Sequence, residues 1–296
     1  MPELPEVETI ARGVHDRVRG DSIVEAWFGS HREPFKMPPA QQAKALQGCT
    51  IVAVHRTGKH IVCELESGKP LSGSNSPVNR REAKRLDGKS RLDGQSQWIV
   101  HLGMTGRLLV TTPDAPVAAH THARLLLASG KELRFVDPRR FGRLEFRDLA
   151  RVDAFTAPGA DPLVIETAEF AQLFRGRKLA IKAALLNQTL LAGVGNIYAD
   201  ESLFRAALRP TKIAGKLTKT ELERLRLALR QVLEHAIQLG GSSVSDYVDA
   251  DGIRGFFQLE HCVYLRTGQP CPTCQTPIRR ILLAGRGTHY CSKCQQ

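Results

Sequence analysis

The sequence lacks any stretch that could cross a membrane or direct export. No apolar run reaches the about 18 residues that a membrane helix needs. The N-terminus is acidic, without the basic segment and apolar core of a signal peptide, so we expect a cytoplasmic protein. Acidic residues are scarce relative to basic ones, because 30 Asp and Glu oppose 42 Lys and Arg to give a net charge of +12. This excess favours nucleic acid as partner, although solubility or attraction to anionic surfaces would also account for it.

Cysteine is rare except at the C-terminal end, where four of the seven cysteines stand in two pairs. Their spacing is Cys271-x2-Cys274-x16-Cys291-x2-Cys294. Two Cys-x-x-Cys turns joined by a hairpin supply the four thiolates of a closed tetrahedral site, which predicts one structural Zn²⁺ ion. A redox disulfide would not need the second pair. The remaining three cysteines are scattered, so a disulfide framework is excluded.

The spacing of apolar residues divides the chain into a β-rich and a helical part. Residues 3–19 have helical spacing, and short runs rich in branched residues then follow, as is typical of a β-sandwich or flattened barrel. Further on, Thr218 and Glu221 form a capping box before an apolar stripe. The expected strands cover 23–28, 50–54, 60–65, 98–102, 107–110, 123–127, 133–136 and 143–146, and the expected later helices cover 167–174, 181–187, 197–207 and 219–239.

We therefore expect an α+β protein in four parts. They are an N-terminal β-sandwich domain (1–148), a linker (149–165), a helical domain (166–258) and a zinc finger (259–296). Within the first part, residues 69–96 are rich in Ser, Gly and Arg and carry seven basic against three acidic residues. We interpret this segment as a disordered, solvated insertion, with added DNA attraction as the alternative.

The first residues are unusual for a terminus. Removal of Met1, which a small second residue permits, would leave Pro2 with a free secondary amine. An α-amine titrates near about 7.7–8.0, well below lysine, so it can attack a carbonyl carbon and form a Schiff base. Glu3 would be its acid or base partner. Taken alone, these residues favour a simpler interpretation, in which the prolines stiffen the terminus and the glutamates suit a helix N-terminus.

Several other segments place reactive side chains in turns. Lys59 follows Gly58 at a turn before a strand, Arg286 lies near the tip of the predicted zinc hairpin, and Asn196 is a candidate N-cap after Gly-x-Gly. Two loops after strands carry Met104, Arg139 and Phe141, which are large enough to fill the gap that a flipped base leaves in a duplex. For each residue alone, a solvated turn or a core position is the simpler interpretation.

Together these segments resemble the bacterial formamidopyrimidine-DNA glycosylase family. The resemblance covers nearly the whole chain except 69–96. It rests on Pro-Glu-Leu-Pro-Glu-Val-Glu at the start, His-Leu-Gly-Met-Thr-Gly, Asp-Pro-Arg-Arg-Phe-Gly, Gly-Val-Gly-Asn-Ile-Tyr-Ala-Asp-Glu and the zinc finger, in that order. It implies a helix-two-turn-helix motif, and a monomer is the natural expectation for a protein that clamps one duplex between two domains. The activity that it implies is that of a bifunctional DNA glycosylase and AP lyase acting on duplex DNA with oxidised purines.

The resemblance also implies roles for individual residues. Pro2 would form the imine at C1′, Glu3 would handle protons, and Glu6 would help shape the lesion pocket. Lys59 would act in β-elimination and Arg286 in phosphate binding and δ-elimination. The expected DNA contacts are His120, Arg139, Arg177, Lys182 and Asn196, and the expected gap-filling residues are Met104, Arg139 and Phe141.

Two other functions fit parts of the sequence. An enzyme resembling endonuclease VIII, which prefers oxidised pyrimidines, shares the proline and the zinc finger, but the Glu-Leu-Pro-Glu opening and the gap-filling set favour the purine enzyme. A non-catalytic damaged-DNA-binding protein would need only the zinc finger and the Asn196 turn. The presence of Pro2, Glu3 and Lys59 argues against it.

Overall fold

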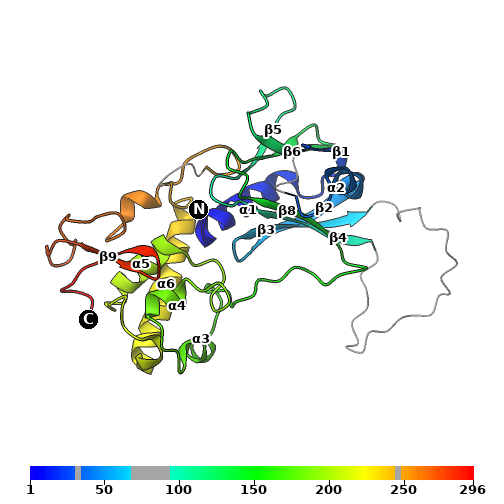
Figure 1. The fold of residues 1–296 in the computed structure, drawn as a ribbon. Helices are drawn as coiled ribbons and strands as arrows, with labels where there is room; N and C mark the ends of the chain where they lie inside the picture. The colour runs from blue at the N-terminus through cyan, green and yellow to red at the C-terminus, as the bar shows by residue number, and fades with distance from the viewer. Residues whose placement is uncertain (31–34, 68–93, 244–247) are drawn as a thin grey trace, which may run out of the picture.

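The computed structural model describes residues 1–30, 35–67, 94–243 and 248–296. Figure 1 shows a β-rich half and a helical half joined along α1. The elements of the first half are α1 (Leu4–Val18), β1 (Ile23–Phe28), α2 (Pro39–Leu46), β2 (Cys49–Thr57), β3 (His60–Ser67), β4 (Gln95–His101), β5 (Arg107–Thr111), β6 (Thr121–Leu127), β7 (Glu132–Val136) and β8 (Arg143–Asp148).

The eight strands form two antiparallel four-stranded sheets, in the orders β1-β6-β7-β5 and β2-β3-β4-β8. Apolar side chains from both sheets enter one core, among them Ile61 and Val100 from one sheet and Leu125 and Phe135 from the other. Burying the inner face of each sheet against the other is the arrangement of a β-sandwich. The predicted sandwich and its strands are therefore confirmed.

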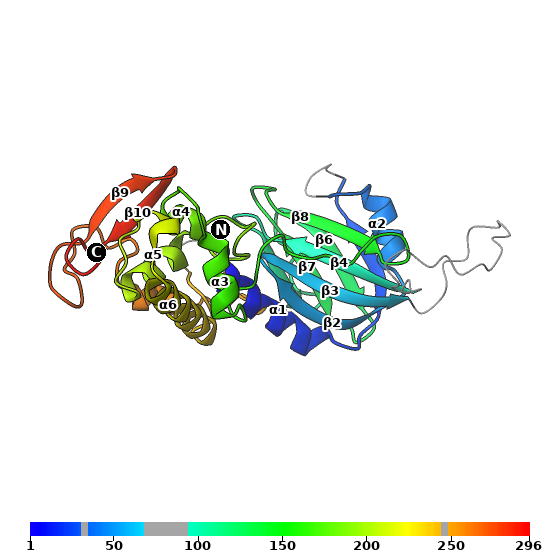
Figure 2. The same cartoon turned by 90° about the horizontal axis from the view of Figure 1, so that it is seen from below.

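The described residues of the second half form four α-helices and a β-hairpin. Its elements are α3 (Thr167–Phe174), α4 (Ile181–Leu185), α5 (Asn196–Arg205), α6 (Lys219–Gln238), β9 (Arg279–Leu283) and β10 (Arg286–Tyr290), with short 3₁₀ turns η1 (Ala214–Lys216) and η2 (Phe257–Glu260). Figure 2 shows the hairpin, the helices and the sandwich following one another along the molecule. The predicted capping box of α6 is confirmed, since Thr218 Oγ1 accepts from Glu221 N and the Glu221 side chain accepts from Thr218 N.

Helix α1 belongs to both halves. Its first residue, Leu4, lies in the core formed by α3 to α6, whereas Val7, Ile10 and Val14 lie in the sandwich core. The helix begins with a capping box, in which the Glu3 side chain accepts a hydrogen bond from the backbone of Glu6 and the Glu6 side chain accepts one from the backbone of Glu3. Pro5 occupies the first turn of the helix. The start of the chain is therefore fixed at the junction of the two cores.

The structure differs from the sequence-based expectations at two points, and a third expectation is largely untested. Helix α2 was not predicted, because only Gln42 and Leu46 of its eight residues are buried and the apolar pattern is correspondingly weak. Asn196 is not an N-cap, since Gly195 holds that position and Asn196 is the first helical residue. Most of the predicted insertion over 69–96 lies outside the described residues, and β4 already begins at Gln95.

Across the described ranges of the chain, no helix is long and apolar enough to span a membrane.

We predict that Leu4→Ala lowers the free energy of unfolding by about 2–5 kcal/mol, the usual loss for a large side chain removed from a core. Because Leu4 is fully buried in the helical core, amide hydrogen exchange should increase in α5 and α6. The matched control Leu65→Ala, in the sandwich core, should increase exchange in the sheets instead. Faster exchange of the sheets alone in Leu4→Ala would contradict the assignment.

Candidate active site at the domain junction

The N-terminus of α1 packs directly against the segment that precedes α5. Leu4 N donates to Gly193 O at 3.0 Å, and Ile197 N donates to Glu3 Oε1 at 3.3 Å. A Cβ atom added to Gly195 would lie 2.1–2.5 Å from the carboxylate atoms of Glu3. Glycine is thus required at 195 because Glu3 occupies the space of a side chain there.

Glu3 is a buried carboxylate with one oxygen left free. Its side chain is almost inaccessible, with 5% of the residue exposed, and Oε2 has no hydrogen-bond partner in the part of the chain that the structure describes. Burial raises the pKa of Glu3 to about 7, while the positive charge of Lys59 opposes this rise. Glu3 can therefore both accept and donate a proton near neutral pH.

Glu6 connects three segments that are distant in sequence. Its carboxylate accepts from Glu3 N at 2.8 Å, from Ser242 N at 2.7 Å and from the hydroxyl of Tyr198. Burial raises the pKa of Glu6 above its ordinary value, although these hydrogen bonds favour the charged form. Glu6 thus fixes α1 to α5 and to the start of the segment after α6.

Lys59 lies in the turn between β2 and β3, where Gly58 has φ +61°. Burial lowers the pKa of Lys59, the negative charge of Glu3 raises it, and the positive charge of Arg286 lowers it further. Lys59 thus lies within electrostatic reach of both Glu3 and Arg286, two residues from other parts of the chain that were predicted separately. Pro2 is buried beside Glu3 in the same region.

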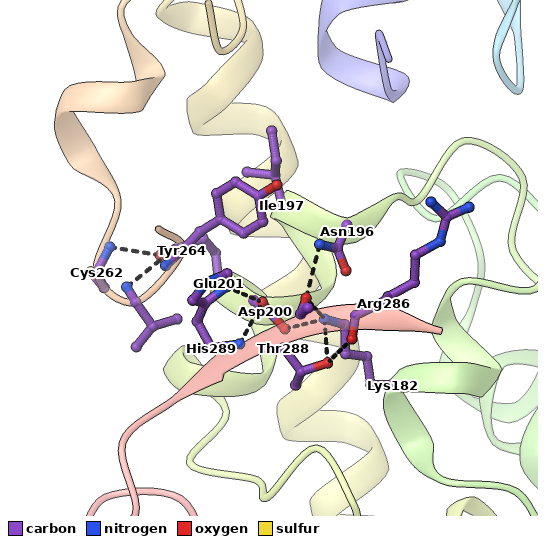
Figure 3. A network of polar contacts seen from close by, with 12 residues as sticks. Lys182, Asn196, Ile197, Asp200, Glu201, Cys262, Tyr264, Arg286, Thr288 and His289 are labelled. Atoms are coloured by element: carbon purple, nitrogen blue, oxygen red, sulfur yellow. Dashed lines mark hydrogen bonds and ion pairs between the residues drawn. The ribbon is translucent and has the colours of Figure 1, made fainter. Parts of the chain in front are cut away.

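Arg286 is presented by the zinc hairpin. The hairpin turn consists of Ala284 and Gly285, both with positive φ, as a two-residue turn requires, and Arg286 opens β10. The Arg286 side chain is exposed and extends away from the polar network beneath it (Figure 3). A guanidinium in this position is suited to bind phosphate.

The network beneath Arg286 is built on a buried ion pair. Lys182 Nζ lies 2.7 Å from Asp200 Oδ1 and donates to Gly287 O and Thr288 Oγ1 of β10 (Figure 3). The other oxygen of Asp200 accepts from His289 N at 2.9 Å. Lys182 is fully buried, so the expected direct contact of Lys182 with DNA does not fit the structure. Lys182 instead holds strand β10 against α4 and α5.

Three other expected DNA contacts occupy different positions. Asn196 Nδ2 donates to Gly287 O at 3.0 Å, so Asn196 lies beside the hairpin that carries Arg286. His120 is exposed, and its carbonyl accepts from Asp137 N. Arg177 follows α3, and its Nε donates back to Leu173 O at 2.5 Å. The structure thus brings Asn196 close to Arg286, whereas Arg177 is engaged with its own helix.

The two expected gap-filling loops are joined by one aspartate. Asp137, fully buried, accepts from Thr105 Oγ1 at 2.6 Å in one loop and from Gly142 N at 2.8 Å in the other. Met104 is 42% and Phe141 49% exposed. The third member, Arg139, lies over the ring of its neighbour Phe141, with Cζ 4.6 Å from the ring centroid. The three side chains are therefore displayed on the surface rather than used in the core.

The four C-terminal cysteines form a metal site of the predicted type. Their sulfur atoms all lie within 4.8 Å of one another, with Cys271 Sγ 3.9 Å from Cys294 Sγ and Cys274 Sγ 3.4 Å from Cys291 Sγ. Four thiolates about 2.3 Å from a tetrahedral Zn²⁺ ion are about 3.8 Å apart, so the donor set and spacing fit one structural zinc.

Some residues that organise the site were not identified from sequence. Asp137 had a local signal, because an aspartate before proline at a strand end commonly accepts from the following backbone. Asp200 and Arg56, whose side chains lie among segments far apart in sequence, had none. Their pairing partners are brought to them only by the fold.

A β-sandwich joined through α1 to a helical domain and a four-cysteine hairpin, with buried acid and base at the junction, defines the class of zinc-finger DNA glycosylases. The chain matches the formamidopyrimidine-DNA glycosylase N-terminal domain over residues 1–144, the H2TH domain of the same enzymes over 158–248 and the zinc finger found in FPG and IleRS over 268–296. It belongs to the formamidopyrimidine-DNA glycosylase family.

Individual relatives are similar to this chain over nearly their full length. The chain is 40% identical to the formamidopyrimidine-DNA glycosylase of Solibacter usitatus, covering 100% of both chains. It is 41% identical to that of Thermus thermophilus, covering 100% of this chain and 98% of the relative. Among solved structures, a mutant Lactococcus lactis FPG in complex with Fapy-dG-containing DNA matches with TM-score 0.82 and 32% identity over 100% of both chains. The MutM (FPG) protein of Thermus thermophilus matches with TM-score 0.78 and 37% identity, over 99% of this chain and 98% of that one.

We predict that Glu3→Gln stabilises the protein at pH 8 but not at pH 4. A carboxyl group whose pKa is about 7 when folded but about 4.5 when unfolded destabilises the folded state as the pH rises through this interval, since the unfolded chain loses its proton first. Removing the charge should add up to about 3 kcal/mol at pH 8. Denaturant unfolding of both proteins at the two pH values measures this difference. The control Glu234→Gln alters a half-exposed carboxylate paired with Arg230 and should show no such dependence on pH. Equal stabilisation by Glu3→Gln at pH 4 would contradict the assignment.

We predict that Asp137→Ala weakens binding to duplexes with a missing base more than binding to intact duplexes. The substitution leaves buried donors of both loops without an acceptor, and each unpaired donor costs about 1–3 kcal/mol of stability. The loops that carry Met104 and Phe141 are then no longer held together. Fluorescence of 2-aminopurine opposite a tetrahydrofuran site reports their insertion. The control Glu132→Gln changes a buried carboxylate on β7, the strand that precedes Asp137, and should retain insertion. An unchanged signal in Asp137→Ala would refute the role of the aspartate.

Proposed function

We propose that this chain excises oxidised purines, such as 8-oxoguanine and formamidopyrimidines, from duplex DNA and then cleaves the strand at the resulting abasic site. One observation carries the proposal. Glu3 is buried beside Pro2, has a free carboxylate oxygen and a pKa of about 7, and lies within electrostatic reach of Lys59, which in turn lies within electrostatic reach of Arg286. A nucleophile, a proton carrier and two cations at one junction are what base excision with strand cleavage requires.

The reaction follows from these groups. After loss of Met1, the secondary amine of Pro2 attacks C1′, and the base leaves with a proton. The sugar ring then opens at the C1′–O4′ bond, with a proton passing from Glu3 to O4′, and C1′ becomes part of an iminium. The iminium acidifies the C2′ proton, and Lys59 acts in its removal, which expels the 3′ phosphate by β-elimination. Glu3 exchanges protons with the sugar oxygen, because its pKa lies near neutrality. Arg286 binds the phosphate beside the lesion and assists the second, δ-elimination.

We propose the following DNA contacts. Arg139 faces the orphaned cytosine, Met104 and Phe141 fill the gap, and Asn196 and His120 contact phosphates. Arg177 requires a side-chain rearrangement to join them, because its Nε now bonds to the end of α3. Glu6 supports the lesion pocket by holding Ser242 at the start of the segment after α6.

We also propose that the chain is divided into domains as the sequence predicts, at 1–148, 149–165, 166–258 and 259–296.

Known complexes of relatives support this substrate class. The Lactococcus lactis protein has been solved with Fapy-dG-containing DNA and with abasic-site-containing DNA. The same protein has also been solved with DNA that contains an oxidised pyrimidine. Oxidised pyrimidines are therefore a second candidate substrate for this chain.

We further propose that the protein acts as a monomer in the cytoplasm, associated with the nucleoid.

The test is to mix the protein with a duplex carrying 8-oxoguanine opposite cytosine and add borohydride, which reduces an imine to a stable amine. We expect a covalent protein–DNA complex whose cross-linked peptide begins at Pro2. Pro2→Gly should abolish strand cleavage while duplex binding remains. Cleavage by Pro2→Gly at the wild-type rate would refute the proline mechanism.

A second duplex carrying an oxidised pyrimidine separates the two substrate classes. Trapping on the purine lesion at a greater rate supports the proposed preference, and the reverse order would assign the chain to pyrimidine repair. Binding of both duplexes with no trapped complex on either would leave a damage-binding protein and would overturn the catalytic assignment.

A further inference from the structure

A buried arginine just before the catalytic-lysine turn is bonded to both halves of the molecule. Arg56 is the second-last residue of β2, and its side chain is only 5% exposed. Its Nε donates to Glu8 Oε2 of α1 at 2.8 Å, and its Nη2 donates to Asp161 Oδ2 at 2.5 Å. Glu8 belongs to the helix that enters the sandwich core, whereas Asp161 belongs to the segment that enters the helical domain.

The third bond of Arg56 reaches the turn itself. Its Nη1 lies 3.4 Å from Gly58 O, the carbonyl immediately before Lys59. Gly58 is also closely packed, because a Cβ atom there would lie 3.3 Å from the Cβ atoms of both Ala157 and Ala192. The turn is therefore enclosed by the linker on one side and by the segment before α5 on the other.

The linker is in turn fixed to the segment that supports Glu3. Ala160 N donates to Leu190 O at 3.0 Å and Ala192 N donates to Ala160 O at 2.9 Å. Asp161, the next residue, also accepts from Leu163 N at 2.9 Å through its other oxygen. Backbone hydrogen bonds of Ala160, the residue before Asp161, therefore connect the linker to the 190–192 segment, which leads directly to the glycines that contact Leu4 and Glu3.

We propose that Arg56 is a positioning residue that, held by Glu8 and Asp161, fixes the Gly58-Lys59 turn relative to Glu3 across the domain junction. The inference rests on the proposed function of Lys59 in strand cleavage. A guanidinium suits this role because its rigid fork donates in several directions at once and is always charged. Lysine, a single flexible donor, could satisfy only part of the arrangement.

The variant that tests the inference is Asp161→Asn, which keeps the size of the side chain and removes the charge that draws Arg56 toward the linker. On a preformed abasic duplex under single-turnover conditions, we expect β-elimination to slow about tenfold, equivalent to about 1.4 kcal/mol. The fraction trapped by borohydride should remain at the wild-type level, because imine formation needs Pro2 and not Lys59. Arg56→Lys should give an intermediate loss.

The matched control is Arg134→Lys, which alters another buried arginine that is ion-paired to Glu132 within the sandwich. It should lose stability comparably to Arg56→Lys but retain cleavage below its unfolding temperature. Unchanged cleavage in Asp161→Asn, or an equal loss of trapping and cleavage, would overturn the inference.

A readout that does not depend on activity separates this inference from the proposed function. Lysines carrying ¹³C-methyl groups can be titrated by NMR, and Lys59, partly buried in the wild type, should titrate closer to an ordinary lysine in Asp161→Asn. If wild-type protein neither traps nor cleaves, the proposed function fails while the Lys59 resonance still decides the positioning role. An identical Lys59 titration in both proteins would refute it.

Discussion

The contact between the carboxylate of Glu3 and the backbone of Gly195 is the constraint on which the site depends. It fixes the first residues of the chain against the N-terminus of α5, and no side chain fits at 195 while Glu3 is there. The same contact removes Glu3 from water and thereby raises its pKa to about 7. Burial of a charge is unfavourable, and the packing of Leu4 in the helical core offsets that penalty. Packing at the junction thus keeps the Glu3 carboxylate buried, although burial of its charge destabilises the folded protein.

Two buried ion-pair networks support the segments that carry the cations of the site, Lys59 and Arg286. Lys182 and Asp200 hold β10 and so determine where the zinc hairpin presents Arg286. In the second network, Arg56 is ion-paired with Glu8 and Asp161 and donates to Gly58 O in the turn that carries Lys59. In both cases a paired, desolvated charge outside the site orients an exposed or partly exposed charge within it. Breaking a buried pair is more harmful than its net contribution suggests, because it leaves one charge unpaired.

The loops with Met104, Arg139 and Phe141 show a different use of burial. Asp137 satisfies backbone and hydroxyl donors from both loops inside the protein, which leaves the large side chains outside. Exposure of a methionine and a phenylalanine is unfavourable in water, so these residues would find a lower-energy environment between bases. The geometry of the loops thus accords with the family to which the chain belongs.

The sequence by itself determined the elements and the metal site. Apolar periodicity located the strands and the long helices, the capping box of Thr218 fixed the start of α6, and the spacing of Cys271, Cys274, Cys291 and Cys294 specified a four-sulfur site, because these signals are local. Glu3, Lys59 and Arg286 were candidates from local sequence, but only the ordered motifs, through resemblance, favoured a catalytic role over the simpler interpretations. Tertiary structure alone decided that Lys182 is a buried support rather than a DNA contact, that Gly195 caps α5, and that Arg56 and Asp137 join separate segments. Such roles depend on which partners the fold brings within about 3 Å, and no local pattern of residues encodes that proximity.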